Sequence, residues 1–203
     1  MDKRIKAITE LIENGIGCVD VGTDHAYVPI SLYKRGYSGN IIATDINQGP
    51  LITAKKNAGC IDKIEFIQTD GLDNIDYGKI DTIVVAGMGG DLICDIIDRA
   101  EWTMDSAYKL ILQPMTKSEV LRFWLVNNGY NIEKETYIDC YTILSVRFSG
   151  QNSRYNDSEI YVGKNPSKEY FLKQFNYIMK KQNLQFYKTI IEDLKHEYGP
   201  KYL

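Results

Sequence analysis

The chain has 203 residues, of which 44% are hydrophobic and 25% charged, and its formal net charge is −3. These values are typical of a folded chain with a sizeable core, and they exclude wholesale disorder and a disulfide miniprotein. No stretch approaches the roughly 20 uninterrupted apolar residues of a membrane span. Four scattered cysteines without a C-x-x-C pair, and only two histidines, argue against a zinc site and favour reduced thiols. We therefore expect a cytoplasmic, monomeric protein that uses neither a membrane nor a metal.

The first 150 residues alternate short β-branched runs with helical stretches. The N-terminal segment MDKRIKAITELIENG lacks the apolar core of a signal peptide and predicts an amphipathic helix, with one side formed by Ile5, Ile8, Leu11 and Ile12. The predicted strands that follow are 17–22, 40–46, 63–70, 80–87 and 109–114, and the predicted helices are 25–36, 48–59, 91–100 and 117–129. Strands separated by single helices indicate right-handed crossovers and a mostly parallel sheet covered on both faces.

The last two strands of this region break the alternation. Residues 130–139 and 141–148 have too little chain between them for a helix, so we expect an antiparallel hairpin. A parallel sheet closed by such a hairpin resembles the seven-stranded, S-adenosylmethionine-dependent methyltransferases. The predicted fold class is therefore α/β: a Rossmann-like methyltransferase sheet, parallel with an antiparallel C-terminal hairpin, plus a small helical C-terminal extension.

The composition changes after Phe148, which predicts a methyltransferase domain at 1–150 and a helical extension at 151–203. Residues 149–159 are polar and turn-forming and predict a connector or an irregular edge. Residues 165–199 show helical spacing from Pro166 to Gly199-Pro200, with a phase change near Asn183 that allows one long helix or two short ones. The extension carries nine basic against six acidic residues. This balance fits contact with a polyanion, and it equally fits a solvated helix with one packed face.

The strongest local signal is Asp20-Val21-Gly22-Thr23-Asp24-His25, which follows the first predicted strand. Ligands of open α/β sheets bind at this edge, and Gly22 allows the backbone to approach one closely. The glycine pattern of a dinucleotide site is missing, which argues against an NAD-dependent enzyme. Carboxylates at Asp20 and Asp24 suit the amino acid end and the sulfonium of S-adenosylmethionine. The alternative is an ordinary acidic turn.

Two further aspartates end the next two strands. Asp45 can accept hydrogen bonds from both ribose hydroxyls of an adenosine, and Asp70 can reach the adenine amino group. The alternative is that these aspartates cap helices. The neighbours of these residues in sequence complete this part of the predicted cofactor site: Thr23, Ile46 and Gly71.

The fourth strand ends in a glycine-rich loop, Ala86-Gly87-Met88-Gly89-Gly90. Methyltransferases that act on exocyclic amines carry an Asp/Asn-Pro-Pro-aromatic motif here, and this chain lacks it. Backbone carbonyls and little steric bulk would let a planar base lie near the sulfonium, so Ala86 to Gly89 are assigned to the cofactor site; the alternative is a tight turn. Gln113 and Pro114 could line the same cleft.

Four of these segments resemble one family. DVGTDHAYVP (20–29), TDGL (69–72), AGMGG (86–90) and LILQP (110–114) are similar to the bacterial tRNA (adenine(22)-N1)-methyltransferases, and the resemblance extends to about residue 148. It implies that S-adenosylmethionine is the cofactor, that N1 of an adenine in the tRNA D-loop region is methylated, and that the helical extension helps to hold the RNA.

The expected reaction is an in-line attack of adenine N1 on the sulfonium methyl group. Asp24 is the first candidate for stabilising the cationic product or accepting an N6 proton, and His25 and Tyr27 are candidates for acid–base work or stacking. The predicted RNA contacts are Arg4, Gln113, Pro114, Lys181, Lys188 and Lys195. The three lysines recur every seven residues, which places them on one helix face; a solvated charged face is the alternative. A methyltransferase for a small molecule or a protein, and a non-catalytic cofactor-binding protein, also remain open.

Overall fold

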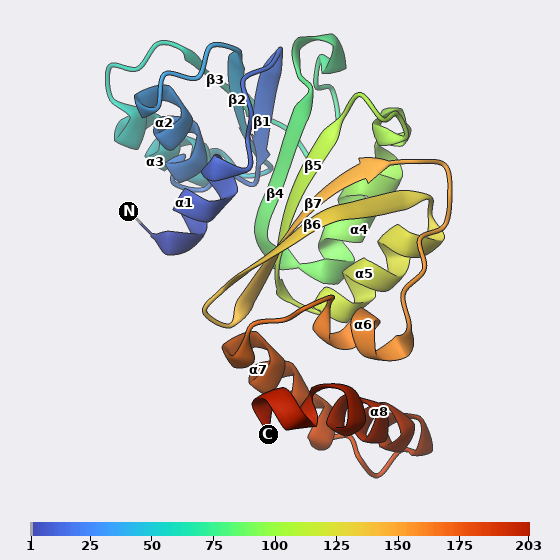
Figure 1. Ribbon diagram of the computed structural model, residues 1–203. Helices are drawn as coiled ribbons and strands as arrows, with labels where there is room; N and C mark the ends of the chain where they lie inside the picture. Colours follow the sequence, from blue (N-terminus) through green and yellow to red (C-terminus); the bar gives the residue numbers. More distant parts are fainter. Residues whose placement is uncertain (1) are drawn as a thin grey trace.

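The computed structural model describes residues 2–203 and contains a seven-stranded sheet with the strand order β3-β2-β1-β4-β5-β7-β6 (Figure 1). Neighbouring strands pair in parallel except β7, which is antiparallel to both β5 and β6. The strands are β1 Gly17–Val21, β2 Asn40–Asp45, β3 Ile64–Gln68, β4 Thr82–Gly89, β5 Lys109–Thr116, β6 Tyr130–Ile138 and β7 Tyr141–Phe148. The predicted fold class is confirmed.

Helices cover both faces of the sheet (Figure 1). One face packs against α1 Lys3–Glu10, α2 Tyr27–Lys34 and α3 Gln48–Ala58, and the other against α4 Gly90–Arg99 and α5 Ser118–Asn127. Two short 3-10 helices, Tyr77–Lys79 and Glu101–Thr103, complete this part of the chain. Successive strand residues enter opposite cores: Cys18 packs with α1 and α2, whereas Val19 packs with α4. Because both faces are covered, the strands read as continuous apolar runs, which is why they were predictable.

The C-terminal extension consists of α6 Asp157–Val162, α7 Lys168–Met179 and α8 Gln185–Tyr202, which share a separate apolar core. The predicted break near Asn183 is confirmed. The prediction of an irregular connector at 149–159 is wrong at its end, where α6 begins. Asn156 and Glu159 form a capping box, in which each side chain satisfies the other residue's backbone N–H, and this stabilises the short helix.

The prediction that the last helix ends at Gly199-Pro200 is also wrong, because α8 continues to Tyr202. Pro200 lies inside this helix, where its ring removes an N–H donor and crowds the carbonyl four residues before it, so the last turn needs support from packing. Tyr198 and Tyr202 pack against Phe171 of α7, with ring centroids 5.5 and 5.2 Å away. This packing holds the last turn of the helix in place.

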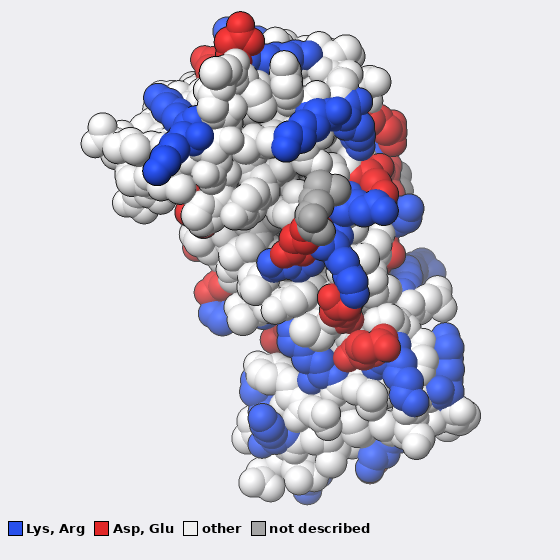
Figure 2. All heavy atoms as spheres, turned by 90° about the vertical axis from the view of Figure 1, so that its left-hand side faces the viewer, with Lys and Arg blue, Asp and Glu red and all other residues white. Residues whose placement is uncertain are grey.

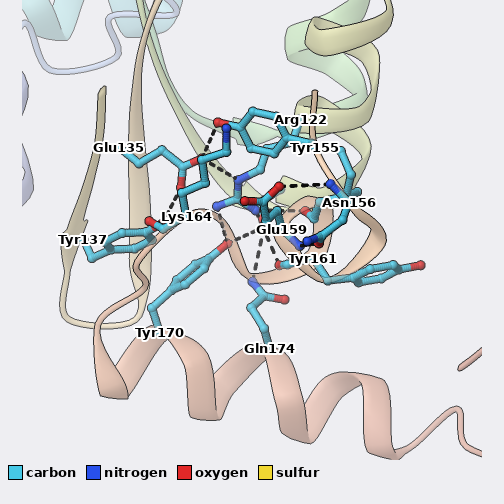
Figure 3. A network of polar contacts seen from close by, with 12 residues as sticks. Arg122, Glu135, Tyr137, Tyr155, Asn156, Glu159, Tyr161, Lys164, Tyr170 and Gln174 are labelled. Carbon is cyan, nitrogen blue, oxygen red and sulfur yellow. Dashed lines mark hydrogen bonds and ion pairs between the residues drawn. The ribbon is translucent and has the colours of Figure 1, made fainter. Parts of the chain in front are cut away.

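A buried polar network joins the extension to the sheet domain (Figure 3). Its centre is Arg122 of α5, whose side chain is fully buried and lies 3.3 Å from the Glu135 carboxylate of β6. The guanidinium also donates to the Ile160 carbonyl of α6 at 3.2 Å and to the Tyr170 hydroxyl of α7 at 3.0 Å. Burial opposes the charge of Arg122, but Tyr170 and Glu135 outweigh it and raise the pKa of the guanidinium. Four elements are thereby fixed to one another.

Candidate active site

Two cavities open at the carboxyl edge of the sheet, and Gly22 lines both of them. The first has a volume of about 270 Å³ and is lined by Arg4, Ile5, Ile8, Asp20, Gly22, Thr23, Asp24, His25, Tyr27, Val28, Ala86, Gly87 and Gln113. The second has a volume of about 290 Å³ and is lined by Val21, Gly22, Asp45, Ile46, Thr69, Asp70, Gly71, Met88, Leu92 and Ile96. We call them the acceptor cavity and the adenosine cavity.

The residues predicted to bind a cofactor line these two cavities, with the exception of Gly89. Gly89 is the N-cap of α4 and contributes to neither lining. Strand β4 runs on through the glycine-rich loop to this residue, two positions past the predicted strand end, with register shifts around Met88. The assignment of Gly89 to the cofactor site stays a prediction.

The loop between β1 and α2 has an unusual backbone. Gly22 has φ +69°, and a Cβ at this position would collide with the methyl group of Met88. Asp24 and Ala26 also have positive φ angles of 48° and 57°, which side chains other than glycine rarely adopt. Such strain costs about 1–3 kcal/mol per residue and persists where the surrounding structure imposes it, often at functional sites.

Asp20 is buried on β1 at the wall of the acceptor cavity, with an exposure of 6%. Burial raises the pKa of its carboxyl group to about 7, although the hydroxyl of Thr23 donates to it at 2.6 Å and acts in the opposite direction. A cationic ligand group placed here would favour the ionised carboxylate. The charge of Asp20 therefore depends on pH near neutrality.

Three polar groups lie together at the mouth of the acceptor cavity. Nε2 of His25 is 3.3 Å from the carboxylate of Asp24, and the His25 ring stacks on Tyr27 with centroids 5.3 Å apart. The Asp24 side chain is 64% exposed, so a ligand can reach it. Helix α2 begins at Tyr27 rather than at His25, and its N-cap is Ala26, so His25 does not cap the helix.

The adenosine cavity combines carboxylates with exposed apolar side chains. Asp45 is nearly buried, and one of its oxygens accepts from the Asn47 N–H at 2.9 Å. Ile46 and Leu92 line the cavity although 56% and 49% of their surfaces are exposed. Both oxygens of Asp70 accept from Arg99 at 2.9 Å, and this ion pair lowers the pKa of Asp70.

The lining chemistry fits S-adenosylmethionine. Apolar side chains suit the faces of an adenine, Asp45 suits the ribose hydroxyls, and Asp20 suits the ammonium of an amino acid. Gly87 has φ +82°, and the space beside its Cα is open, so a ligand can approach the backbone there. Within residues 2–203 no group of His, Cys, Asp and Glu side chains could hold a metal ion.

Some residues of the linings were missed by sequence reasoning. The helical spacing of Ile5 with Ile8, and of Leu92 with Ile96, was a usable signal for apolar faces, but it did not reveal that these faces line cavities. Arg99 had no sequence signal, because α4 brings it to Asp70 from 29 positions away.

The predicted RNA contacts lie in different parts of the molecule. Arg4 and Gln113 line the acceptor cavity, but Pro114, the next residue of β5, lines a different one. Lys188 and Lys195 are exposed on α8, as predicted. Lys181 lies in the turn between α7 and α8, where its ammonium donates to the hydroxyls of Tyr177 and Tyr187. The prediction of three lysines on one helix face is therefore wrong, because α7 ends at Met179.

Known proteins share this architecture. A curated Bacillus subtilis (strain 168) tRNA (adenine(22)-N(1))-methyltransferase is 29% identical over 97% of this chain and 82% of its own length. A Streptococcus pneumoniae protein solved in complex with S-adenosyl-L-methionine is 28% identical, with a TM-score of 0.81 over 96% of either chain. M. capricolum TrmK, solved with S-adenosyl-homocysteine, is 26% identical, with a TM-score of 0.69 over 96% of this chain and 95% of its own.

The family model described as "Methyltransferase domain" matches residues 1–144. This range includes every lining residue of the acceptor cavity and of the adenosine cavity. The match spans well over half of the chain. The strand order and the ligand edge described above agree with it. This chain belongs to the methyltransferase domain family.

Proposed function

We propose that this protein is an S-adenosylmethionine-dependent methyltransferase that modifies N1 of adenine 22 in tRNA. The observation that carries the proposal is the pair of cavities that meet at Gly22: one suits an adenosine, and the other suits a planar acceptor. The choice of acceptor follows from the similarity to the Bacillus subtilis protein, which is a tRNA (adenine(22)-N(1))-methyltransferase.

In this proposal the cofactor spans both cavities. Ile46 and Leu92 would hold its adenine, Asp45 its ribose, and Asp20 its amino acid end. When bound, S-adenosylmethionine supplies an electrophilic methyl group. The remaining contribution of the chain is to hold the acceptor base in line, which can be worth about 7–11 kcal/mol in well-oriented reactions.

The acceptor cavity would place the target adenine between Gly87, His25 and Tyr27. N1 of adenine has a free lone pair, so its attack needs no strong base. Methylation leaves a cationic base, and the Asp24 carboxylate at the cavity mouth would stabilise that charge or accept a proton from N6. Because N1 lies on the Watson–Crick edge, the base must be unpaired or turned out of its helix, which costs a few kcal/mol.

The test of this proposal is transfer of labelled methyl from S-adenosylmethionine to unmodified tRNA, followed by nucleoside mass spectrometry. The proposal predicts a 1-methyladenine peak. Measurable cofactor binding without incorporation into total tRNA would overturn it and would favour a small-molecule or protein acceptor.

Affinity for S-adenosylmethionine should increase with pH around neutrality. The cofactor ammonium favours ionised Asp20, whose pKa in the free protein is about 7. Below this pH the carboxyl must lose a proton before binding, so the dissociation constant should rise about tenfold from pH 8 to pH 6. Calorimetric titration at pH 6, 7 and 8 measures this. An Asp20→Asn variant should bind more weakly and lose the component of the pH dependence that belongs to Asp20; an unchanged pH profile would contradict the assignment.

We further propose that residues 1–150 carry out methyl transfer and that residues 151–203 contact the RNA. Figure 2 shows Lys and Arg side chains spread over the lower lobe, which the extension forms, and Asp and Glu mostly nearer its junction with the sheet domain. We also propose that the protein acts as a monomer in the cytoplasm, where a tRNA substrate would be found. Among residues 2–203 no helix has the length and apolar character needed to cross a bilayer.

Replacing both Lys188 and Lys195 by Met should weaken tRNA binding and reduce its salt dependence. Each phosphate contact contributes a little under one unit to the slope of log K against log salt, so losing two contacts should lower the slope by about 1.5–2. Fluorescence titration of tRNA at several salt concentrations measures the slope. The matched control replaces Lys56 and Lys79, which are exposed on the sheet domain. If both double variants gave the same slope of log K against log salt, Lys188 and Lys195 would lie on a solvated face without phosphate contacts.

A further inference from the structure

A third cavity lies between the sheet domain and the helical extension. Its volume is about 380 Å³, larger than that of either cavity at the sheet edge. Three parts of the chain enclose it: the segment from the end of β5 to the start of α5, the turn between β6 and β7, and helix α7. Its lining consists of Pro114, Met115, Thr116, Lys117, Ser118, Glu119, Cys140, Tyr141, Tyr170, Lys173, Gln174 and Tyr177. We call it the interdomain cavity.

The interdomain cavity is next to the acceptor cavity. Gln113 of β5 lines the acceptor cavity, and the next residue, Pro114, lines the interdomain cavity. Arg4 lines the acceptor cavity, yet its guanidinium donates to the Met115 sulfur at 3.1 Å and lies 5.2 Å from the ring centroid of Tyr141. A polymeric substrate held in the acceptor cavity would therefore pass directly over Arg4 into this second space.

The lining combines aromatic rings with basic side chains. Tyr177 is 38% exposed, and the Lys181 ammonium lies 4.3 Å from its ring centroid, so a planar group would stack on the opposite face of the ring. The Lys173 ammonium donates to the carbonyl of Cys140 at 3.0 Å and lies over the Tyr141 ring. The Lys181 ammonium donates to the hydroxyl of Tyr177. The groups that hold these two ammonium ions are neutral, so their charges can attract a phosphate. The acidic lining residue is Glu119, while Lys117 is paired with Asp91 at 2.5 Å.

The wall that α7 contributes is fixed by the buried network of Figure 3. The Tyr170 hydroxyl, held by Arg122, is 2.8 Å from the Ser118 hydroxyl, which also accepts from the Gln174 amide at 3.2 Å. All three of Ser118, Tyr170 and Gln174 line the cavity. The cavity is therefore preorganised, with its shape set by hydrogen bonds that join the two parts of the chain.

From this geometry we infer that the interdomain cavity binds a nucleotide of the RNA substrate other than the target adenine. The base stacks against Tyr177, and the adjoining phosphate is held by Lys173 and Lys181. Stacking on tyrosine accepts any base, so the cavity grips the RNA without reading its sequence. The inference rests on the proposed function, because it supplies the second contact for the same tRNA. The extension thereby forms one side of a substrate site as well as a charged surface.

The experiment measures steady-state methylation of tRNA by Tyr177→Leu, Tyr177→Phe and Lys173→Met. Loss of one stacked base should raise the KM for tRNA about tenfold or more in Tyr177→Leu, while kcat and S-adenosylmethionine affinity stay within about twofold. Tyr177→Phe keeps the ring and loses only one of the two hydroxyls that hold Lys181, since Tyr187 supplies the other, so its KM should rise much less than that of Tyr177→Leu. Lys173→Met should also raise KM and weaken its salt dependence.

The matched control is Lys168→Met, an exposed lysine on the same helix that does not line the cavity. A KM rise shared equally by Lys168→Met and Lys173→Met, or by Tyr177→Phe and Tyr177→Leu, would overturn the inference, as would unchanged KM values. Wild-type protein that methylates no tRNA would instead refute the proposed function, so the two failures are distinguishable.

Discussion

Replacing Asp24 by Asn should lower kcat for tRNA methylation by about 100-fold or more while leaving the S-adenosylmethionine dissociation constant nearly unchanged. The carboxylate lines the acceptor cavity beside His25. In the proposed reaction, positive charge would develop there on the methylated base. Groups that stabilise such charge or transfer a proton typically contribute 10²–10⁴-fold. Asparagine tolerates the left-handed backbone that Asp24 adopts at φ +48°, so the loop should keep its shape.

Single-turnover methylation with saturating cofactor and tRNA measures the effect on the chemical step. Asp62→Asn is the matched control, since Asp62 is exposed and lines neither cavity at the sheet edge. If Asp24→Asn turned over as fast as Asp62→Asn while binding cofactor normally, the role of Asp24 would be lost. His25 would then become the first candidate for the acid–base group.

Replacing Arg122 by Met should lower the free energy of unfolding by about 3–5 kcal/mol. The substitution leaves the Glu135 carboxylate, whose side chain is 5% exposed, without its cationic partner. An uncompensated buried charge of this kind is among the most costly single changes. The same substitution also removes the donors to α6 and α7, so the extension should loosen from the sheet domain.

Urea unfolding followed by circular dichroism measures this effect. The control is Arg147→Met, which removes a partly exposed partner of Glu133 at 3.6 Å and should cost about 1 kcal/mol. Adding Glu135→Gln to Arg122→Met should restore part of the stability, because the buried charge is then gone. If Arg122→Met cost no more than Arg147→Met, the network would not hold the extension in place.

The sheet domain was predictable because each of its signals is local. Buried parallel strands are short apolar runs, and their carboxyl ends share one edge, so Asp20, Asp45 and Asp70 could be brought to one ligand from sequence positions alone. The positions of these carboxylates around two cavities agree with that reasoning. The roles assigned to them stay predictions until cofactor binding is measured.

The parts that sequence reasoning missed depend on contacts between distant segments. Arg99 reaches Asp70, and Arg122 reaches α6 and α7, only after the chain has folded, and no local pattern marks either arginine. The interdomain cavity likewise exists only because α7 docks beside the end of β5. The seven-residue spacing of the lysines was misleading, since spacing has a helical meaning only where the helix is continuous, and α7 ends before Lys181.

The most direct test compares two unmodified tRNA transcripts that differ only at position 22, one with adenine and one with guanine. With labelled S-adenosylmethionine, the first should incorporate methyl groups that nucleoside mass spectrometry identifies as 1-methyladenine, and the second should incorporate none. Equal incorporation into both transcripts, or none into either despite cofactor binding, would contradict the proposed reaction at adenine 22.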